Sequence, residues 1–178
     1  MKSIFKEIKV FKPQVYFDKR GVFFESFDKS MSDDLNQAFT QDNHSHSYTN
    51  VIRGLHYQWN KPMGKLVRVA KGKIIDYFVD IRKDSVTYGQ YDSIMLSDKN
   101  RVAVWIPPGF AHGFEVLEND TLVLYKCTAY YNKDGESGIN PFDKEINIPW
   151  QVSKEKMIIS DKDFNSQTFA EYSLDPKF

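Results

Sequence analysis

Short runs of alternating apolar and polar residues fill the middle of the chain, and this alternation predicts β-strands. Polar or Gly/Pro breaks such as Lys71-Gly72-Lys73 and Pro107-Pro108-Gly109 separate the runs. The predicted strands are 8–11, 22–27, 65–69, 74–82, 91–96, 102–106, 113–117 and 121–128. Strands this short, at this spacing, are typical of an all-β sandwich or barrel.

Helical periodicity is scarce. Residues 31–38 predict one short helix, with Ser30 or Ser32 as its N-cap. Residues 41–47 are polar and predict a loop, and the tail after Ile159 has no clear pattern. We find no repeat, low-complexity stretch or linker, so one domain over residues 1–178 is expected.

Charge and composition narrow the class of protein. Lys plus Arg and Asp plus Glu both number 24, which gives no electrostatic reason to expect a nucleic acid or an anionic membrane as partner. Neither a bilayer-spanning run nor the apolar region of a signal peptide is evident, and the single cysteine, Cys127, excludes an intrachain disulfide. We therefore expect a cytoplasmic location.

Two of the four histidines suggest a barrel site. His112 ends the sequence Pro107-Pro108-Gly109-Phe110-Ala111-His112, whose form P-x-G-x-x-H resembles the second conserved motif of cupins, where the histidine normally binds a metal. The first cupin motif would supply further ligands, but this chain has His56-Tyr57-Gln58 and then Gly64-Lys65. A lysine among candidate ligands repels a divalent cation, so we expect no catalytic metal. His44 and His46, in the polar segment, are interpreted as solvated residues.

The strand pattern places two further polar groups toward the interior. Lys65 shares a strand face with Val67 and Val69, so its ammonium group should enter the apolar interior, where it could stabilise an oxyanion. A neutral histidine nearby could then act as a general base. Tyr125 lies on an apolar face of strand 121–128, where a tyrosine is more often a core residue than a proton donor.

Together these blocks resemble the dTDP-4-dehydrorhamnose 3,5-epimerase family. They occur in the family's order and cover nearly the whole chain. The matching segments are Asp18-Lys19-Arg20-Gly21-Val22-Phe23-Phe24-Glu25-Ser26, Gln41-Asp42-Asn43-His44-Ser45, Arg53-Gly54-Leu55-His56-Tyr57-Gln58, Gly64-Lys65-Leu66-Val67-Arg68, Val79-Asp80-Ile81-Arg82, Pro107 to Phe114, Leu124-Tyr125-Lys126 and Ser160-Asp161-Lys162-Asp163.

The resemblance implies a cupin-type jelly-roll β-barrel with short peripheral helices and an enzyme that needs no cofactor. Its substrate would be a nucleotide-linked 4-keto-6-deoxy sugar, inverted at C3 and C5. By the resemblance, His56 is the general base and Asp163 orients it. Tyr125 returns a proton to the opposite face and Lys65 lies near the enolate oxygen, while His112 lines the same pocket.

The resemblance also implies a nucleotide site and a homodimer. The early strands of one subunit would cross to its partner, so that some of these residues serve the neighbouring site. Residues assigned to diphosphate or nucleoside contacts are Arg20, Gln41, Asn43, Arg53 and Lys162, with Phe23 and Tyr131 stacking on the base and Glu25 alongside. Those assigned to the neighbouring subunit are Arg20, Phe23 and Glu25.

Several readings stay open. Relatives commonly carry Trp-Asn-Asp where this chain reads Asn140-Pro141-Phe142-Asp143, a stretch we expect near the substrate opening, so the exact sugar is not fixed. Alternatives are a C3-only epimerase, or an epimerase of a GDP-linked keto heptose or hexose. A cupin-fold ketoisomerase, a non-catalytic sugar-nucleotide-binding module and, more distantly, a metal-dependent cupin oxygenase complete the set.

Overall fold

The computed structural model describes residues 3–178. Its strands, in chain order, are β1 (Lys9–Phe11), β2 (Val15–Asp18), β3 (Gly21–Phe24), β4 (Gln41–Ser47), β5 (Ile52–Gln58), β6 (Lys65–Lys71), β7 (Lys73–Asp80), β8 (Tyr91–Ser97), β9 (Ala103–Ile106), β10 (Phe110–Val116), β11 (Thr121–Cys127) and β12 (Glu136–Gly138). The helices are α1 (Lys29–Leu35), the 3-10 turn η1 (Lys133–Gly135), α2 (Asp161–Phe164) and α3 (Phe169–Leu174).

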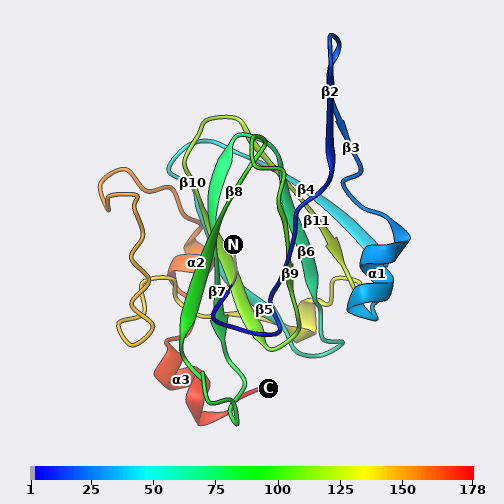
Figure 1. The fold of residues 1–178 in the computed structure, drawn as a ribbon. Helices are drawn as coiled ribbons and strands as arrows, with labels where there is room; N and C mark the ends of the chain where they lie inside the picture. The colour runs from blue at the N-terminus through cyan, green and yellow to red at the C-terminus, as the bar shows by residue number, and fades with distance from the viewer. Residues whose placement is uncertain (1–2) are drawn as a thin grey trace.

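Two five-stranded antiparallel sheets face each other and form a jelly-roll barrel (Figure 1). The first sheet has the order β1-β9-β6-β11-β4, and the second has the order β12-β5-β10-β7-β8. Strands that follow one another in the chain often belong to different sheets, so the chain crosses repeatedly between the two walls. The short helices lie at the periphery.

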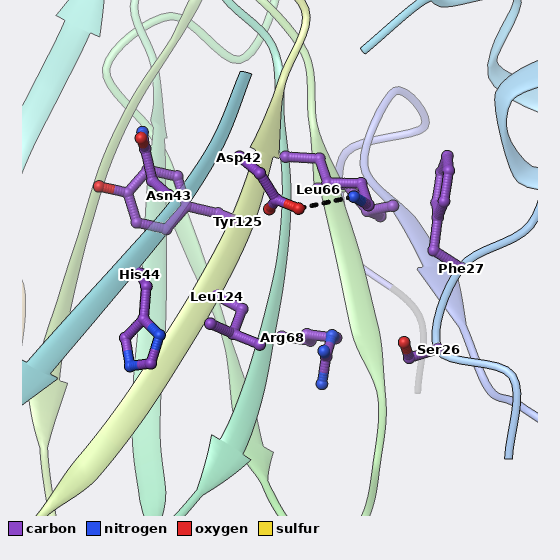
Figure 2. A pocket seen from close by; sticks show the side chains of 10 residues that line it. Ser26, Phe27, Asp42, Asn43, His44, Leu66, Arg68, Leu124 and Tyr125 are labelled. Carbon is purple, nitrogen blue, oxygen red and sulfur yellow. Dashed lines mark hydrogen bonds and ion pairs between the residues drawn. The ribbon is translucent and has the colours of Figure 1, made fainter. Parts of the chain in front are cut away.

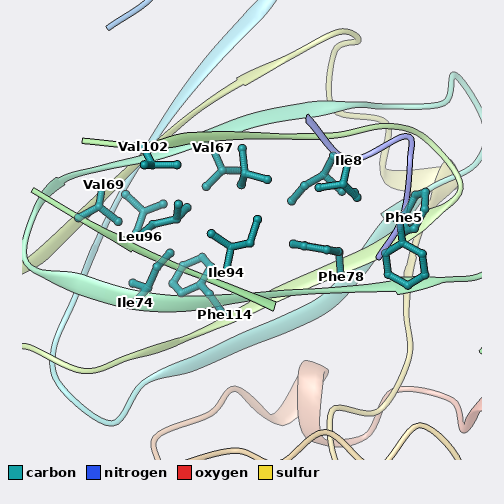
Figure 3. Close-up of a cluster of buried hydrophobic side chains, with 14 of the residues drawn as sticks. Phe5, Ile8, Val67, Val69, Ile74, Phe78, Ile94, Leu96, Val102 and Phe114 are labelled. Carbon is teal, nitrogen blue, oxygen red and sulfur yellow. The ribbon is translucent and has the colours of Figure 1, made fainter. Parts of the chain in front are cut away.

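The main core fills the space between the sheets (Figure 3). Val67 and Val123 from the first sheet meet Ile74, Phe78 and Leu96 from the second, and all five are fully buried. Val and Ile at alternate positions of these strands produce this arrangement, because successive side chains point to opposite faces.

Both sheets also have covered outer faces. The C-terminal segment packs Ile139, Ile146 and Tyr172 against the outer face of the second sheet. Leu35 of α1 and its neighbours pack around Trp105 on the first sheet. The tail after Ile159 contributes Phe169 and Tyr172 to this layer and forms two short capped helices.

A separate hairpin, β2–β3, projects away from the barrel (Figure 1). Its rings are unusually exposed: Tyr16 is 59%, Phe17 is 72% and Phe23 is 66% exposed. Aromatic exposure concentrated on one element is typical of a surface that meets another molecule.

The structure confirms the all-β prediction and corrects several details. The polar segment 41–47 is not a loop but the edge strand β4, because backbone pairing with β11 holds it while its polar side chains stay partly solvated. The N-cap of α1 is Asp28, not Ser30 or Ser32, since its carboxylate accepts the Met31 N–H. Within residues 3–178, no helix combines the length and hydropathy needed to cross a membrane.

Candidate active site

A small cavity of about 100 Å³ lies between the two sheets at one end of the barrel. It combines titratable groups, amides and one thioether. The lining residues are Gln41, Asn43, His56, Tyr57, Gln58, Met63, Lys65, Tyr125, Tyr131 and Glu136. Three of the four residues expected to be catalytic therefore share one cavity, and the fourth contacts it from behind.

A close backbone approach sets the position of His56 on β5. Gly54 has φ +123°, and a Cβ there would lie 2.5 Å from the Cα of Gly113 on β10. Only glycine fits this crossing, since it tolerates both the conformation and the contact. The pairing shifts register just beyond it, and His56 lies directly opposite His112.

Asp163 holds the imidazole of His56. Nε2 of His56 lies 2.8 Å from Oδ1 of Asp163, and the backbone N–H of Gly54 donates to Oδ2 at 3.0 Å. Burial alone would raise the pKa of Asp163, but hydrogen bonds from His56 and Gly54 and the charge of His56 hold it below its ordinary value. Asp163 is thus a carboxylate, Nε2 carries the ring proton, and Nδ1 is left as the base.

Lys65 projects from β6 into the same cavity. Its strand neighbours Val67 and Val69 are buried, which confirms the predicted inward face. Burial lowers the pKa of Lys65, although the charges of Cys127, Asp76 and Glu136 oppose the shift. A cation held in such surroundings interacts strongly with a nearby developing anion.

Tyr125 comes from β11, on the same face as the buried Val123 and Cys127. Its ring lies beside the side chain of Asn43 (Figure 2). Burial raises the pKa of Tyr125, so the phenol keeps its proton at neutral pH.

His56 and Tyr125 face the cavity from opposite walls. β5 belongs to the second sheet, whereas β6 and β11, which carry Lys65 and Tyr125, are neighbours in the first. A flat molecule between the walls would present one face to the imidazole and the other to the phenol.

His112 lies behind the cavity and not among its lining residues. Its Nε2 is 2.5 Å from Oδ1 of Asp76, a fully buried carboxylate on β7 whose Oδ2 has no partner in the described chain. Burial lowers the pKa of His112 despite the opposing effect of Asp76. His112 is therefore held in the neutral form opposite His56, and contrary to expectation it does not line the cavity.

Glu136 organises the outer rim of the cavity. Its Oε2 accepts from the Tyr131 hydroxyl at 3.0 Å and from Lys162 Nζ at 2.5 Å. Gln41 joins this group, since its Oε1 accepts the Tyr131 N–H and its Nε2 donates to Asn43. Burial would raise the pKa of Glu136, but Lys162 and Tyr131 hold it below its ordinary value.

Besides His112 and the rim residue Lys162, four other expected binding residues are not among the lining residues of this cavity. Arg53 is exposed on β5 and donates to the Ser47 hydroxyl at 3.1 Å. Phe23 lies on the β2–β3 hairpin, Arg20 forms an ion pair with Asp18 in its turn, and exposed Glu25 follows directly. The same chain's cavity therefore receives none of the hairpin residues.

A larger cavity of about 500 Å³ lies on the outer side of the first sheet (Figure 2). Its lining includes Arg68, His44 and Leu124, and Lys126 there forms an ion pair with Asp42 at 2.8 Å. No carboxylate–histidine pair is found among its lining residues. Size therefore does not mark the site in this chain; the grouping of base, phenol and buried cation does.

No residue of segment 140–143, expected near the substrate opening, is among the cavity's lining residues. Asn140 and Asp143 instead bond to the backbone of Phe164 and Phe169. Among residues 3–178, no group of three or more His, Cys, Asp or Glu side chains has the arrangement of a metal site.

Sequence reasoning missed Asp76 and Glu136. A carboxylate within the apolar run Ile74 to Val79 was a usable signal for Asp76, because an acid on a buried strand needs a partner. Nothing in the local pattern distinguishes Glu136, since it follows the polar turn η1 and only the fold brings Lys162 to it.

Comparison with known proteins identifies the family to which the chain is similar. The family model described as dTDP-4-dehydrorhamnose 3,5-epimerase matches residues 2–171. Proteins of that description from Methanothermobacter thermautotrophicus and Shigella flexneri are 46% and 43% identical to this chain. The first match covers 88% of this chain and 86% of the relative, and the second covers 96% of each.

A solved structure has nearly the same fold. It is the dTDP-6-deoxy-D-glucose-3,5-epimerase of Legionella pneumophila, in complex with dTDP-4-keto-L-rhamnose. It superposes with a TM-score of 0.90 at 40% identity, over 94% of this chain and 90% of that one. These matches confirm the cupin-type barrel, and this chain belongs to the dTDP-4-dehydrorhamnose 3,5-epimerase family.

Proposed function

We propose that this chain inverts C3 and C5 of a dTDP-linked 4-keto-6-deoxy sugar. The observation that carries the proposal is the placement of His56 and Tyr125 on opposite walls of one cavity, with Lys65 on the strand next to that of Tyr125. Inversion of a carbon requires removal of a proton from one face and delivery of a proton to the other. A binding module needs no such opposed pair.

In the first step, Nδ1 of His56 takes the proton from a carbon next to the ketone. The C–H electrons form a carbon–carbon double bond and the ketone oxygen becomes an enolate. Lys65 stabilises that oxygen, and Asp163 stabilises the imidazolium that forms. A positioned base of this kind contributes about 10²–10⁴-fold to the rate.

In the second step, the Tyr125 hydroxyl gives its proton to the opposite face of the same carbon. The enolate returns to a ketone, and Tyr125 is left as a phenolate. Its high pKa makes the phenolate a strong base, so it regains a proton from solvent while His56 releases one. The same cycle at the second carbon requires only that the ring turn within the site.

The rim residues fit the nucleotide part of such a substrate. Lys162 supplies a cation for a phosphate oxygen, and the exposed ring of Tyr131 offers a stacking surface for a base. Gln41 and Asn43 add amide donors on the adjacent strand. Glu136 is a further candidate contact, since it already holds both Lys162 and Tyr131.

We also propose a homodimer in which the β2–β3 hairpin serves the partner's cavity. The hairpin carries Arg20 and Phe23 away from its own barrel, and its exposed rings lack cover. β4, which bears Gln41 and Asn43, is an edge strand that can accept another strand.

A mixing experiment tests this arrangement. Arg20→Ala protein and His56→Ala protein, each of which we expect to be inactive alone, are unfolded together and refolded. If the hairpin acts on the partner, one site of each hybrid dimer is intact, and activity returns to about one quarter of wild type with random pairing. No recovery would mean that Arg20 acts within its own subunit.

The activity itself is tested with dTDP-4-keto-6-deoxyglucose, with product stereochemistry read by NMR. Conversion to the dTDP-linked 4-keto sugar inverted at C3 and C5 supports the proposal. Inversion of C3 alone, or turnover only of a GDP-linked keto sugar, would replace it with one of the alternative epimerases.

The cytoplasmic location expected from the sequence stays a prediction, which cell fractionation tests.

A further inference from the structure

The short helix α2 carries two of the site residues side by side. Lys162 reaches Glu136 at the rim, and Asp163 reaches His56 in the cavity. α2 spans only Asp161–Phe164, with Ser160 as its N-cap. A single turn has little stability of its own, so other contacts must fix it.

Two amide side chains fix this turn. Nδ2 of Asn140 donates to the carbonyl of Phe164 at 2.7 Å, at the end of α2. Nε2 of Gln167 lies 2.9 Å from the Tyr57 hydroxyl, 3.1 Å from the Ser137 hydroxyl and 3.3 Å from the Gly138 carbonyl. The backbone N–H of Asn140 also donates to the carbonyl of Gln167 at 2.8 Å, which joins the two residues.

These contacts connect α2 to the strand of the base. Tyr57 is the residue after His56 on β5, and Gly138 on β12 pairs with His56 itself. The end of α2 is therefore tied to the same strands that hold the imidazole. Asp163 on this turn lies 2.8 Å from His56.

We propose that Asn140 and Gln167 are positioning residues, which set the approach of Asp163 to His56. This inference rests on the proposed function for its kinetic consequence, but its structural part does not. It also gives a role to the segment that begins at Asn140, whose residues 140–143 do not line the cavity. A shift of about 1 Å at a catalytic group can cost about 10²-fold in rate.

The test compares Asn140→Leu and the double variant Asn140→Leu/Gln167→Met with wild type. Asn165→Leu is the matched control, because Nδ2 of Asn165 also donates to a carbonyl of α2, that of Asp161, but at the exposed side. Exchange of the first substrate proton in heavy water should slow about tenfold or more in both variants. The control should retain the wild-type rate, with KM unchanged throughout.

A double-mutant cycle with Asp163→Asn separates positioning from general loosening. If the amides act through Asp163, adding Asn140→Leu to Asp163→Asn produces no further loss. An equal loss in both backgrounds would overturn the proposal. The single variant Asn140→Leu decides the question if the double variant does not fold.

A second readout does not depend on activity. In the ligand-free protein, the downfield ¹H NMR signal of the His56 imidazole proton reports its bond to Asp163. We expect this signal in wild type and Asn165→Leu, and its loss or broadening in Asn140→Leu. An unchanged signal would overturn the proposal. Loss of the signal in a protein without epimerase activity would support the positioning role while refuting the proposed function.

Discussion

His56 and His112 lie directly opposite each other on β5 and β10, yet each ring bonds to a different carboxylate. Asp163 contacts His56 from a surface helix, and Asp76 contacts His112 from the neighbouring buried strand. Only the His56 ring lines the cavity. Two adjacent histidines thus have different capacities: His56 can exchange a proton with a substrate, while His112 supports the site from the interior.

The first prediction concerns the base. His56→Ala should lower kcat by about 10²–10⁴-fold or more, with little change in affinity for dTDP, because the proposed nucleotide contacts lie at the rim. His46→Ala is the control, since His46 is exposed, pairs with Asp120 and does not line the cavity. Steady-state kinetics and calorimetric titration with dTDP measure the two effects. Full activity in His56→Ala would end the proposed mechanism.

The second prediction concerns the phenol. Tyr125→Phe should slow inversion far more than it slows exchange of the first substrate proton with solvent, because His56 and Lys65 remain in place. Simultaneous NMR measurement of deuterium uptake and of product formation gives both rates. Equal loss of both would show that Tyr125 acts structurally or before proton removal.

The third prediction sets activity against stability at Lys65. Lys65→Met should lower kcat by about 10²-fold, the effect of removing one oxyanion-stabilising group. It should also raise the free energy of unfolding, because burial lowers the pKa of Lys65 and its charge therefore disfavours the folded state. Urea unfolding at pH 7 measures the change. Lower stability would mean that Lys65 is held mainly by favourable ion pairs.

The fourth prediction concerns acid stability at Asp80, away from the cavity. Burial would raise its pKa, but hydrogen bonds from Arg82, Ser85 and Thr87 bring the value down to about 2, from 3.8. A lowered folded-state pKa stabilises the fold above the unfolded value and loses that effect as pH falls toward 2. At one pKa unit per 1.4 kcal/mol, Asp80 contributes about 2 kcal/mol at pH 7.

Asp80→Asn tests this contribution through unfolding by urea at several pH values. The variant should be about 2 kcal/mol less stable than wild type at pH 7, with a difference that narrows between pH 4 and pH 2. A difference that is constant with pH would assign the effect to lost hydrogen-bond geometry instead of charge.

Strand alternation predicted much of this molecule. The inward positions of Lys65 and Tyr125 follow from their spacing to buried valines on β6 and β11, and the structure confirms both. Segment 41–47 was predicted wrongly as a loop because its side chains are polar and show no apolar alternation, although its backbone pairs with β11. An edge strand needs fewer apolar residues than a central one, so composition alone misleads there.

Contacts between residues far apart in the sequence could not be predicted from local sequence patterns. The bond from Glu136 to Lys162 and the bond from Asp163 to His56 each depend on how the C-terminal segment folds across β5 and β12. No residue spacing in the sequence predicts that the C-terminal segment folds back across these strands. The family resemblance predicted a partnership of His56 with Asp163, but it gave no account of Asn140, whose bond to Phe164 appears only in three dimensions.

The most direct test of the central claim is deuterium uptake from heavy water into dTDP-4-keto-6-deoxyglucose, with wild type and His56→Ala compared by NMR and mass spectrometry. The account predicts uptake at both C3 and C5 with inverted stereochemistry in wild type, and uptake at neither above the uncatalysed rate in His56→Ala. Uptake at both carbons in His56→Ala at the wild-type rate would contradict it.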